Sequence, residues 1–235
     1  MNAGLQKTLM LVGAHHDDNE LNAGTIARHV AAGWRVVSVV MTNGRWTPDK
    51  VSDEIIDFRN NESRAAAALL NTEPVFLGFE EGGFTESESS IRAMTAALRR
   101  SEAEVIVTHP PLDYHADHMA VSRCVLEACY RCVNGAYDCG EAPLARAPRL
   151  YYCDGWFTPF DPDLYVDVSE FIELKKKALA CHGSQLGPGG PSPGDMIDLE
   201  ATRARYRGIQ AGVKHAEAFR FAPRAGSVRL AELLT

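Results

Sequence analysis

The chain of 235 residues lacks a long apolar run, an excess of basic residues and an internal repeat. No stretch approaches the roughly 20 apolar residues that a membrane-spanning helix needs. The first apolar run, at residues 8–14, is too short for the apolar core of a signal sequence and is followed at once by His and Asp. These absences predict no membrane span and a cytoplasmic location.

A basic surface is also missing. The formal net charge is -7 and the pI is about 5.6. Lys and Arg are scattered, apart from the run Lys175, Lys176 and Lys177, which we expect to form a solvated helix face. Without a basic patch the chain has little to attract a phosphate backbone, so we expect no nucleic-acid partner.

Cysteine is not abundant enough for a disulfide scaffold. The spacing of Cys124, Cys129, Cys132 and Cys139 is similar to an iron–sulfur pattern. Residues 116–134 have a helical pattern, however, and buried free thiols are common in cytosolic cores. Free buried cysteines are therefore the favoured interpretation.

The chain alternates between strand and helix patterns, and 46% of its residues are apolar. Expected strands lie at residues 8–14, 35–42, 74–77 and 104–108, and expected helices at 21–32, 54–70, 89–100 and 115–133. This alternation predicts an α/β fold with a Rossmann-like, doubly wound, mostly parallel sheet of order 3-2-1-4-5 and helices on both faces. No linker divides the chain, so we expect one domain over residues 1–235.

The second half of the chain is less regular. Residues 150–153 and 164–168 have strand patterns, and residues 169–181 and 199–212 have helical ones, with Ser169 as the expected N-cap. Residues 183–194 contain five glycines and three prolines, which predicts irregular structure. This segment could be a lid or a plain surface connection.

Two clusters of His and Asp follow the first and fourth expected strands. The first reads Ala14-His15-His16-Asp17-Asp18-Asn19-Glu20 and the second Asp113-Tyr114-His115-Ala116-Asp117-His118. In a sheet of order 3-2-1-4-5 these two strands are neighbours and their connections diverge. Ligands bind outside the carboxyl ends of strands at such a point. The two clusters are therefore expected to face each other.

Together the clusters contain the parts of a metal site. His15, Asp18 and His118 could bind zinc and leave a position open for water. Asp17 could then reach that water as a general base, and His115, three residues before His118, could point at the substrate. Asp117 could hydrogen-bond an imidazole and set its tautomer.

Other interpretations of the clusters stay open. Asp and Asn after a strand often cap the next helix or form turns. Two His and one carboxylate also describe non-haem iron(II) oxygenases, so Fe²⁺ is an alternative to Zn²⁺. His109 could orient the site or be structural, and His182 could contact substrate or anchor a loop.

At this point the sequence resembles the LmbE-like, or PIG-L-type, N-deacetylases. Their first motif is Ala-His-Pro-Asp-Asp-x-Glu or close to it, and their second is His-x-Asp-His. The motifs that match elsewhere are Arg59-x-x-Glu62, Lys175-x-x-Ala178-x-x-x-His182-x-Ser184-Gln185 and Glu217-Ala218-Phe219. The sequence departs from the pattern at His16, which replaces a proline, and at Asn71, which replaces a glycine and tolerates the left-handed cap conformation equally.

The resemblance implies a role for each matching residue. It implies zinc held by His15, Asp18 and His118. It implies that Asp17 takes a proton from the activated water and that a protonated His115 stabilises the oxyanion or protonates the leaving amine. It further implies that Asp117 tunes His115 and that Arg59 anchors a sugar hydroxyl.

We therefore expect a zinc-dependent hydrolase that removes an N-acetyl group from a small amino sugar or sugar conjugate. Alternatives are an amidase for a larger acyl group, a metal-dependent oxygenase, and a non-catalytic sugar-binding module. The role of His16, the particular substrate and the oligomeric state, including a homo-oligomer, stay open at this stage.

Overall fold

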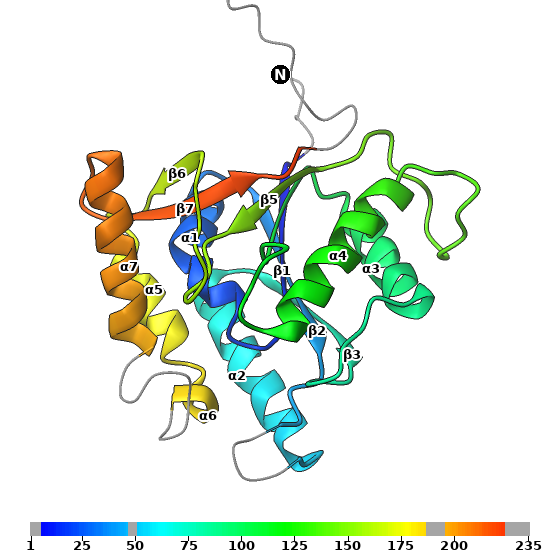
Figure 1. Cartoon of the computed structure of the whole chain (residues 1–235), viewed down its shortest axis with the longest axis horizontal. Helices are drawn as coiled ribbons and strands as arrows, with labels where there is room; N and C mark the ends of the chain where they lie inside the picture. Colours follow the sequence, from blue (N-terminus) through cyan, green and yellow to red (C-terminus); the bar gives the residue numbers. More distant parts are fainter. Residues whose placement is uncertain (1–5, 47–50, 187–195, 224–235) are drawn as a thin grey trace, which may run out of the picture.

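The computed structural model describes residues 6–46, 51–186 and 196–223. Its centre is a seven-stranded sheet of order β3-β2-β1-β4-β5-β7-β6 (Figure 1). The strands are β1 (Thr8–Gly13), β2 (Arg35–Thr42), β3 (Glu73–Phe79), β4 (Val105–Thr108), β5 (Arg149–Cys153), β6 (Leu164–Asp167) and β7 (Ala216–Phe221). The first five strands pair in parallel, and β7 runs antiparallel to both β5 and β6. The predicted fold class and the order 3-2-1-4-5 are confirmed.

Helices cover both faces of the sheet. They are the 3-10 turn η1 (Asn19–Asn22), α1 (Ala23–Ala31), α2 (Glu54–Leu70), α3 (Glu88–Ser101), α4 (Ala116–Arg131), α5 (Ile172–Leu179), α6 (Gly183–Leu186) and α7 (Met196–Ala211). Helices α3 and α4 lie together on one side of β1, and α1, α2 and α5 lie on the other (Figure 1). The expected βα alternation of the first half is thus present.

The side chains of β1 alternate between two apolar cores. Met10 and Val12 belong to the core under α3 and α4, whereas Leu9 and Leu11 belong to the core under α1 and α5. Successive strand residues point to opposite faces, and a strand covered on both faces is apolar throughout. This is why residues 8–13 form an uninterrupted buried run.

The C-terminal part differs from the prediction in several places. Strand β7 was not expected, because three of its six residues, Glu217-Ala218-Phe219, were interpreted only as a motif. Helix α5 begins at Ile172 rather than at 169, since the hydroxyl of Ser169 donates to the Asp167 carboxylate (2.6 Å) and caps no helix. Residues 183–186 are helical, which corrects the expectation of irregular structure there, and residues 187–194 lie outside the described part.

The structure also locates the lysine run and the cysteines. Lys175 is buried, so the expectation of a wholly solvated lysine face was wrong for this residue. All six cysteines are free, and Cys124, Cys129 and Cys132 pack in the core around α4, as the apolar interpretation predicted. Within the described ranges, none of the helices has the length and apolar character needed to span a bilayer.

The sheet places the two polar clusters side by side. Strands β1 and β4 are parallel neighbours, with Val12 opposite Thr108 near their carboxyl ends. Residues 14–22 follow β1 and residues 109–115 follow β4, so both loops leave the same edge of the sheet. The predicted meeting of the two clusters at the topological switch point is therefore present in the fold.

Candidate metal centre

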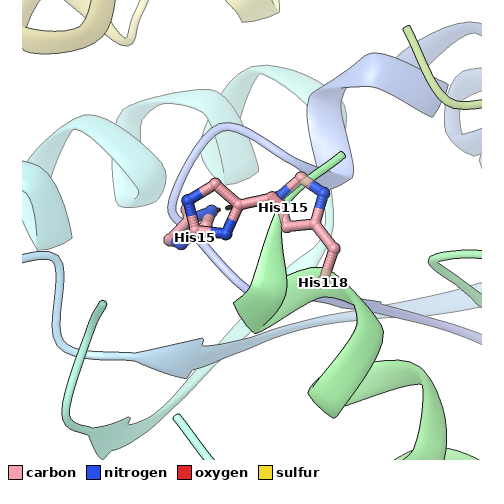
Figure 2. Close-up of side chains that lie close together, drawn as sticks. All are labelled: His15, His115 and His118. Carbon is pink, nitrogen blue, oxygen red and sulfur yellow. Dashed lines mark hydrogen bonds between the residues drawn. The ribbon is translucent and has the colours of Figure 1, made fainter. Parts of the chain in front are cut away.

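Three imidazoles from the two loops gather at this edge of the sheet. Figure 2 shows His15 from the loop after β1 beside His115 and His118 from the start of α4. The ring centroid of His15 lies 4.6 Å from that of His115 and 5.1 Å from that of His118. His15 and His118 are buried, and His115 is partly exposed.

The three predicted ligands present atoms at the spacing of a metal's coordination shell. Nδ1 of His15 and Nε2 of His118 are 3.2 Å apart. Carboxylate oxygens of Asp18 lie 3.5 Å from each of these nitrogens. Atoms bound tetrahedrally at about 2.0–2.2 Å from zinc are separated by roughly 3.3–3.6 Å. The donor set of His15, Asp18 and His118 therefore fits a zinc-sized ion.

The other ring nitrogen of each ligand faces a carboxylate. Nδ1 of His118 is 3.0 Å from Asp113, and Nε2 of His15 is 3.3 Å from Asp117. A neutral imidazole that donates to such a carboxylate turns its lone pair the other way, as metal-ligating histidines do. Here two such lone pairs and the Asp18 carboxylate converge, and a shared cation would remove their repulsion.

The pKa shifts of His15 and Asp18 also favour a cation in this cluster. Burial opposes the charged form of His15, but hydrogen bonds with Asp117 and Asp18 outweigh it and hold the pKa of His15 well above its usual value. Burial alone would raise the pKa of Asp18, yet the nearby His118 and His109 hold it well below its usual value. The site thus keeps Asp18 ionised and favours a positive charge next to it.

Asp17 is the carboxylate left over. It is buried, and within the described residues it makes no hydrogen bond with another side chain. Burial, with the adjacent charge of Asp18, raises its pKa. A carboxylate whose pKa is raised towards neutrality is a better proton acceptor in catalysis than an ordinary one.

His115 stands at the N-terminus of α4 and caps it. Its Nδ1 accepts the backbone N–H of Asp117 at 3.2 Å, which leaves Nε2 as the position for the ring proton. Burial, together with neighbouring His15 and His118, lowers the pKa of His115. The carboxylate of Asp117 contacts His15 rather than His115, so its main partner differs from the one that the resemblance implied.

His109 also belongs to the cluster. Its Nε2 accepts the backbone N–H of Ala14 at 3.0 Å and lies 3.1 Å from the carboxylate of Asp18. Its ring stacks on that of His118 with centroids 3.9 Å apart. Two groups have ligand atoms close enough to share an ion: one is His15, His115 and His118, and the other is Asp18, His109 and His118. Sequence reasoning had left the role of His109 open, and the structure places it against Asp18 and His118.

His16 is part of the packing rather than of the metal cluster. Its Nε2 is 2.9 Å from Oδ1 of Asn60 on α2, and its ring stacks on Phe76 of β3. Burial lowers the pKa of His16 to about 4, so the ring is neutral at pH 7. The residue that departs from the family spelling thus joins the ligand loop to α2.

Arg59 lies buried on α2, within the same region. One Nη donates to the carbonyl of Gly44 at 3.0 Å and lies 3.4 Å from the carboxylate of Glu81. Glu81 also accepts the backbone N–H of Trp46. Arg59 is therefore fixed by the loops after β2 and β3, and Glu81 is a partner that no sequence motif pointed to.

The segment with His182 and Ser184, which follows α5, contacts the loop after β1 and helix α2. The carboxylate of Glu20 lies 3.1 Å from Nε2 of the fully buried His182. Both carboxylate oxygens of Glu62 accept hydrogen bonds from Ser184, one from its N–H and one from its hydroxyl. The contact of His182 with Glu20 joins this segment to the loop after β1. Sequence reasoning also assigned no role to Asp113, which the structure places against Nδ1 of His118.

Comparisons with known proteins agree with this geometry. The family model described as GlcNAc-PI de-N-acetylase (PIG-L) matches residues 10–129, which contain both polar clusters. Diacetylchitobiose deacetylase of Thermococcus kodakarensis is 25% identical over 232 residues, which cover 92% of this chain and 84% of that protein. An uncharacterized deacetylase of Escherichia coli K12, YaiS, is 32% identical over 196 residues, covering 77% and 94%.

The fold is also shared with an enzyme of another reaction class. The structure of GalB, a 4-carboxy-2-hydroxymuconate hydratase of Pseudomonas putida, matches 98% of this chain and 100% of its own with a TM-score of 0.83. Its sequence is 22% identical. A likeness at this level concerns the fold alone, and the reaction has to be argued from the site.

Proposed function

The chain belongs to the PIG-L family of LmbE-like deacetylases, and from this membership we propose that it is a metal-dependent hydrolase of N-acetylated amino sugars or their conjugates. The resemblance drawn from the motifs is thereby confirmed. Relatives named as deacetylases of acetylated sugars support the substrate class. The observation that carries the proposal is the buried carboxylate of Asp17, adjacent to Asp18, beside the converging atoms of His15, Asp18 and His118.

In this proposal His15, Asp18 and His118 would hold the ion, with zinc as the first candidate. Two imidazoles and one carboxylate are a common set for catalytic zinc, and their spacing here fits it. When bound, such an ion would polarise the amide carbonyl and lower the pKa of a water towards about 7. Asp113 and Asp117 would keep the two imidazoles in the tautomer that leaves a lone pair for the ion.

The protein's own groups would then move the protons. Asp17 would accept a proton from the attacking water at a carboxylate oxygen and pass it to the leaving amine. His115 would donate from Nε2 to the developing oxyanion, because its Nδ1 is already used by the cap of α4. Arg59 would bind a sugar hydroxyl through the part of its guanidinium that Gly44 and Glu81 leave free.

The test replaces Asp17 by Asn. Loss of a general base typically costs about 10²- to 10⁴-fold, so we expect kcat for acetate release from N-acetylglucosamine or N,N'-diacetylchitobiose to fall by that amount. Bound zinc should stay near one equivalent, since Asp17 is not a proposed ligand. The exposed Asp161→Asn is the matched control and should keep both activity and metal. Full activity in Asp17→Asn would refute the mechanism.

The same assays separate the alternatives. Release of longer acyl groups in preference to acetate would identify an amidase. Oxygen uptake on adding substrate to the iron-loaded protein would identify an oxygenase. Saccharide binding without turnover of any amide would identify a binding module.

A further inference from the structure

His16 stands inside the loop that carries two of the proposed metal ligands, and no step of the mechanism above uses it. It lies between His15, a proposed ligand, and Asp17, the proposed base. The family motif has a proline at this position, and a proline stiffens a turn because its ring fixes φ at about -65°. Histidine has no such constraint, so in this chain another interaction has to hold the turn.

The ring of His16 is enclosed on three sides. Its Nε2 lies 2.9 Å from Oδ1 of Asn60 on α2. One face stacks on the ring of Phe76 in β3, with 5.8 Å between the centroids and 23° between the planes. At the edge of the ring lies Gly44, where a Cβ would come within 2.5 Å of Cε1 of His16. His16 is only 1% exposed, so this packing holds the ring in one orientation.

The backbone of His16 is bound to the same helix. Its carbonyl accepts a hydrogen bond from the hydroxyl of Ser63 at 3.3 Å. Asn60 and Ser63 are three positions apart and therefore lie on one face of α2. The ligand loop is thus attached to that face at two points of a single residue, the ring and the carbonyl of His16.

The hydrogen bond with Asn60 also defines the form of the imidazole. Because Oδ1 of Asn60 is an acceptor, Nε2 of His16 carries the ring proton and donates it. The other nitrogen, Nδ1, is buried and has no hydrogen-bond partner in the described part of the chain. Burial lowers the pKa of His16 to about 4, so the neutral ring adds no positive charge beside the proposed cation site.

The residues on either side of His16 depend on the shape of this turn. The backbone N–H of His15 donates to Oδ2 of Asp18 at 2.6 Å, and Nδ1 of His15 lies 3.5 Å from the same oxygen. Only His16 and Asp17 separate these two proposed ligands in the chain. A change in the backbone of His16 would therefore move the ligand atoms apart and turn the carboxylate of Asp17.

We propose that His16 is a positioning residue of the metal site, and that its ring, held by Asn60, fixes the turn in place of a proline. It touches neither the ion nor the substrate and acts through His15 and Asp17. This inference rests on the proposed function for the identity of the ligands and of the base. It gives a role to the residue of the first motif that departs from the family pattern.

The experiment measures zinc affinity by calorimetric titration of the apoproteins. His16→Ala should bind Zn²⁺ about 10- to 100-fold more weakly than the wild type, the usual loss when the support of a ligand is removed. His16→Pro should recover most of that loss, because proline stiffens the turn without the help of Asn60. A side chain that only filled space would not be replaced by the smaller proline, so this rescue separates positioning from packing.

A second set of variants tests the partner on α2. Asn60→Ala should weaken zinc binding about two- to tenfold, the worth of one buried hydrogen bond. Added to His16→Ala or His16→Pro, it should cost nothing more, since the hydrogen bond is already absent. Asn61 is the next residue of α2 and is exposed, so Asn61→Ala is the matched control and should bind zinc like the wild type.

Turnover provides a separate readout. At saturating zinc, His16→Ala should lose up to about 100-fold in kcat for acetate release from N-acetylglucosamine, with a smaller change in KM, because a base displaced by about 1 Å loses that much. If the wild type binds zinc but hydrolyses no amide, the proposed function fails and the zinc titrations still decide the role of His16. A wild type without zinc affinity would overturn both.

Two results of the titrations would overturn the inference alone. One is a zinc affinity that is unchanged in His16→Ala and in Asn60→Ala. The other is a loss in His16→Ala that His16→Pro does not reduce and Asn60→Ala does not share, since His16 would then act only by filling space.

Discussion

The carboxylate of Asp117 lies 3.3 Å from Nε2 of His15, on the side of the ring away from His118. The same carboxylate accepts the backbone N–H groups of Gly82 at 2.7 Å and Phe84 at 3.1 Å. One side chain at the start of α4 thus holds both a proposed ligand from the loop after β1 and the loop after β3. Burial would raise the pKa of Asp117, but the bond with His15 and the other contacts hold it below its usual value.

We expect Asp117→Asn to weaken metal binding by about 10- to 100-fold, the usual effect of losing a carboxylate behind a ligating imidazole. Asn keeps the shape and one acceptor for Gly82, so the fold should survive, but it removes the charge that orients His15. Calorimetric titration of the apoprotein with Zn²⁺ measures the change. Asp161→Asn serves again as control, and equal zinc affinity in both variants would contradict this role.

A second prediction concerns the close approach of Gly44 to His16. Gly44 has φ +69°, and a Cβ there would lie 2.5 Å from the His16 ring and 3.1 Å from the Arg59 side chain. Gly44→Ala should therefore add a clash to the strain of roughly 1 kcal/mol that a left-handed alanine suffers. Gly33 has φ +83° with nothing within 4 Å of its Cβ, so Gly33→Ala isolates the strain.

The comparison is made by urea denaturation of both variants. We expect Gly44→Ala to lose at least about 1 kcal/mol more than Gly33→Ala, because overpacking a well-filled site typically costs about 1–3 kcal/mol. Activity should fall with it, since Arg59 and the ligand loop both contact this position. Equal losses of unfolding free energy in the two variants would show that the loop at Gly44 shifts to accommodate the added Cβ without cost.

The sequence was enough to predict the first half of the fold and the meeting of the two polar clusters. The run at residues 8–13 is buried on both faces, and its apolar pattern is visible without a structure. The order of strands then put His15 and His118 together, although they are 103 residues apart. Local pattern and a general rule of topology were sufficient here.

What could not be predicted depends on partners far along the chain. Lys175 belongs to a run of three lysines, and only the fold shows that Glu200 and Glu217 meet it in the interior. Glu20 and His182 are likewise 162 residues apart, with no pattern to link them. Pairing of this kind arises from packing, so neither propensity nor periodicity contains it.

A third prediction follows from the pair of His182 with Glu20. Burial opposes the charged imidazole, but the hydrogen bond with Glu20 outweighs it and raises the pKa of His182 above its usual 6.5. A group whose pKa is raised on folding contributes stability that is complete below its unfolded pKa and is lost as pH rises through the folded value. The contribution of His182 should therefore be complete below its usual pKa of 6.5 and decline as the pH rises above it.

The measurement is the free energy of unfolding of wild type and His182→Gln at several pH values, at one fixed metal concentration. The difference between the two proteins should be largest near pH 6 and smaller near pH 9. The partly buried His215 has a pKa lowered by burial and by nearby Lys214, so His215→Gln should not show this trend. A difference that is constant with pH would mean that His182 is held as a neutral ring.

The last prediction concerns the buried charge of Lys175. Its ammonium lies 2.9 Å from Glu200 and 2.8 Å from Glu217, and the three side chains are at most 5% exposed. Glu217 in turn accepts the first backbone N–H groups of α1, at Gly24 and Thr25. Lys175→Met would leave the Glu217 carboxylate buried without its cation and Glu200 paired with Arg203 alone, a change that costs about 3–5 kcal/mol of unfolding free energy.

Lys176 supplies the matched control one position along the same helix. It is paired with Glu173 at the surface, so Lys176→Met should cost no more than about 0.5 kcal/mol. Adding Glu217→Gln to Lys175→Met removes the unpaired charge and should recover part of the loss, although the cap of α1 weakens. Urea denaturation of the four proteins tests the argument, and equal costs for Lys175→Met and Lys176→Met would show that the buried network contributes nothing to the fold.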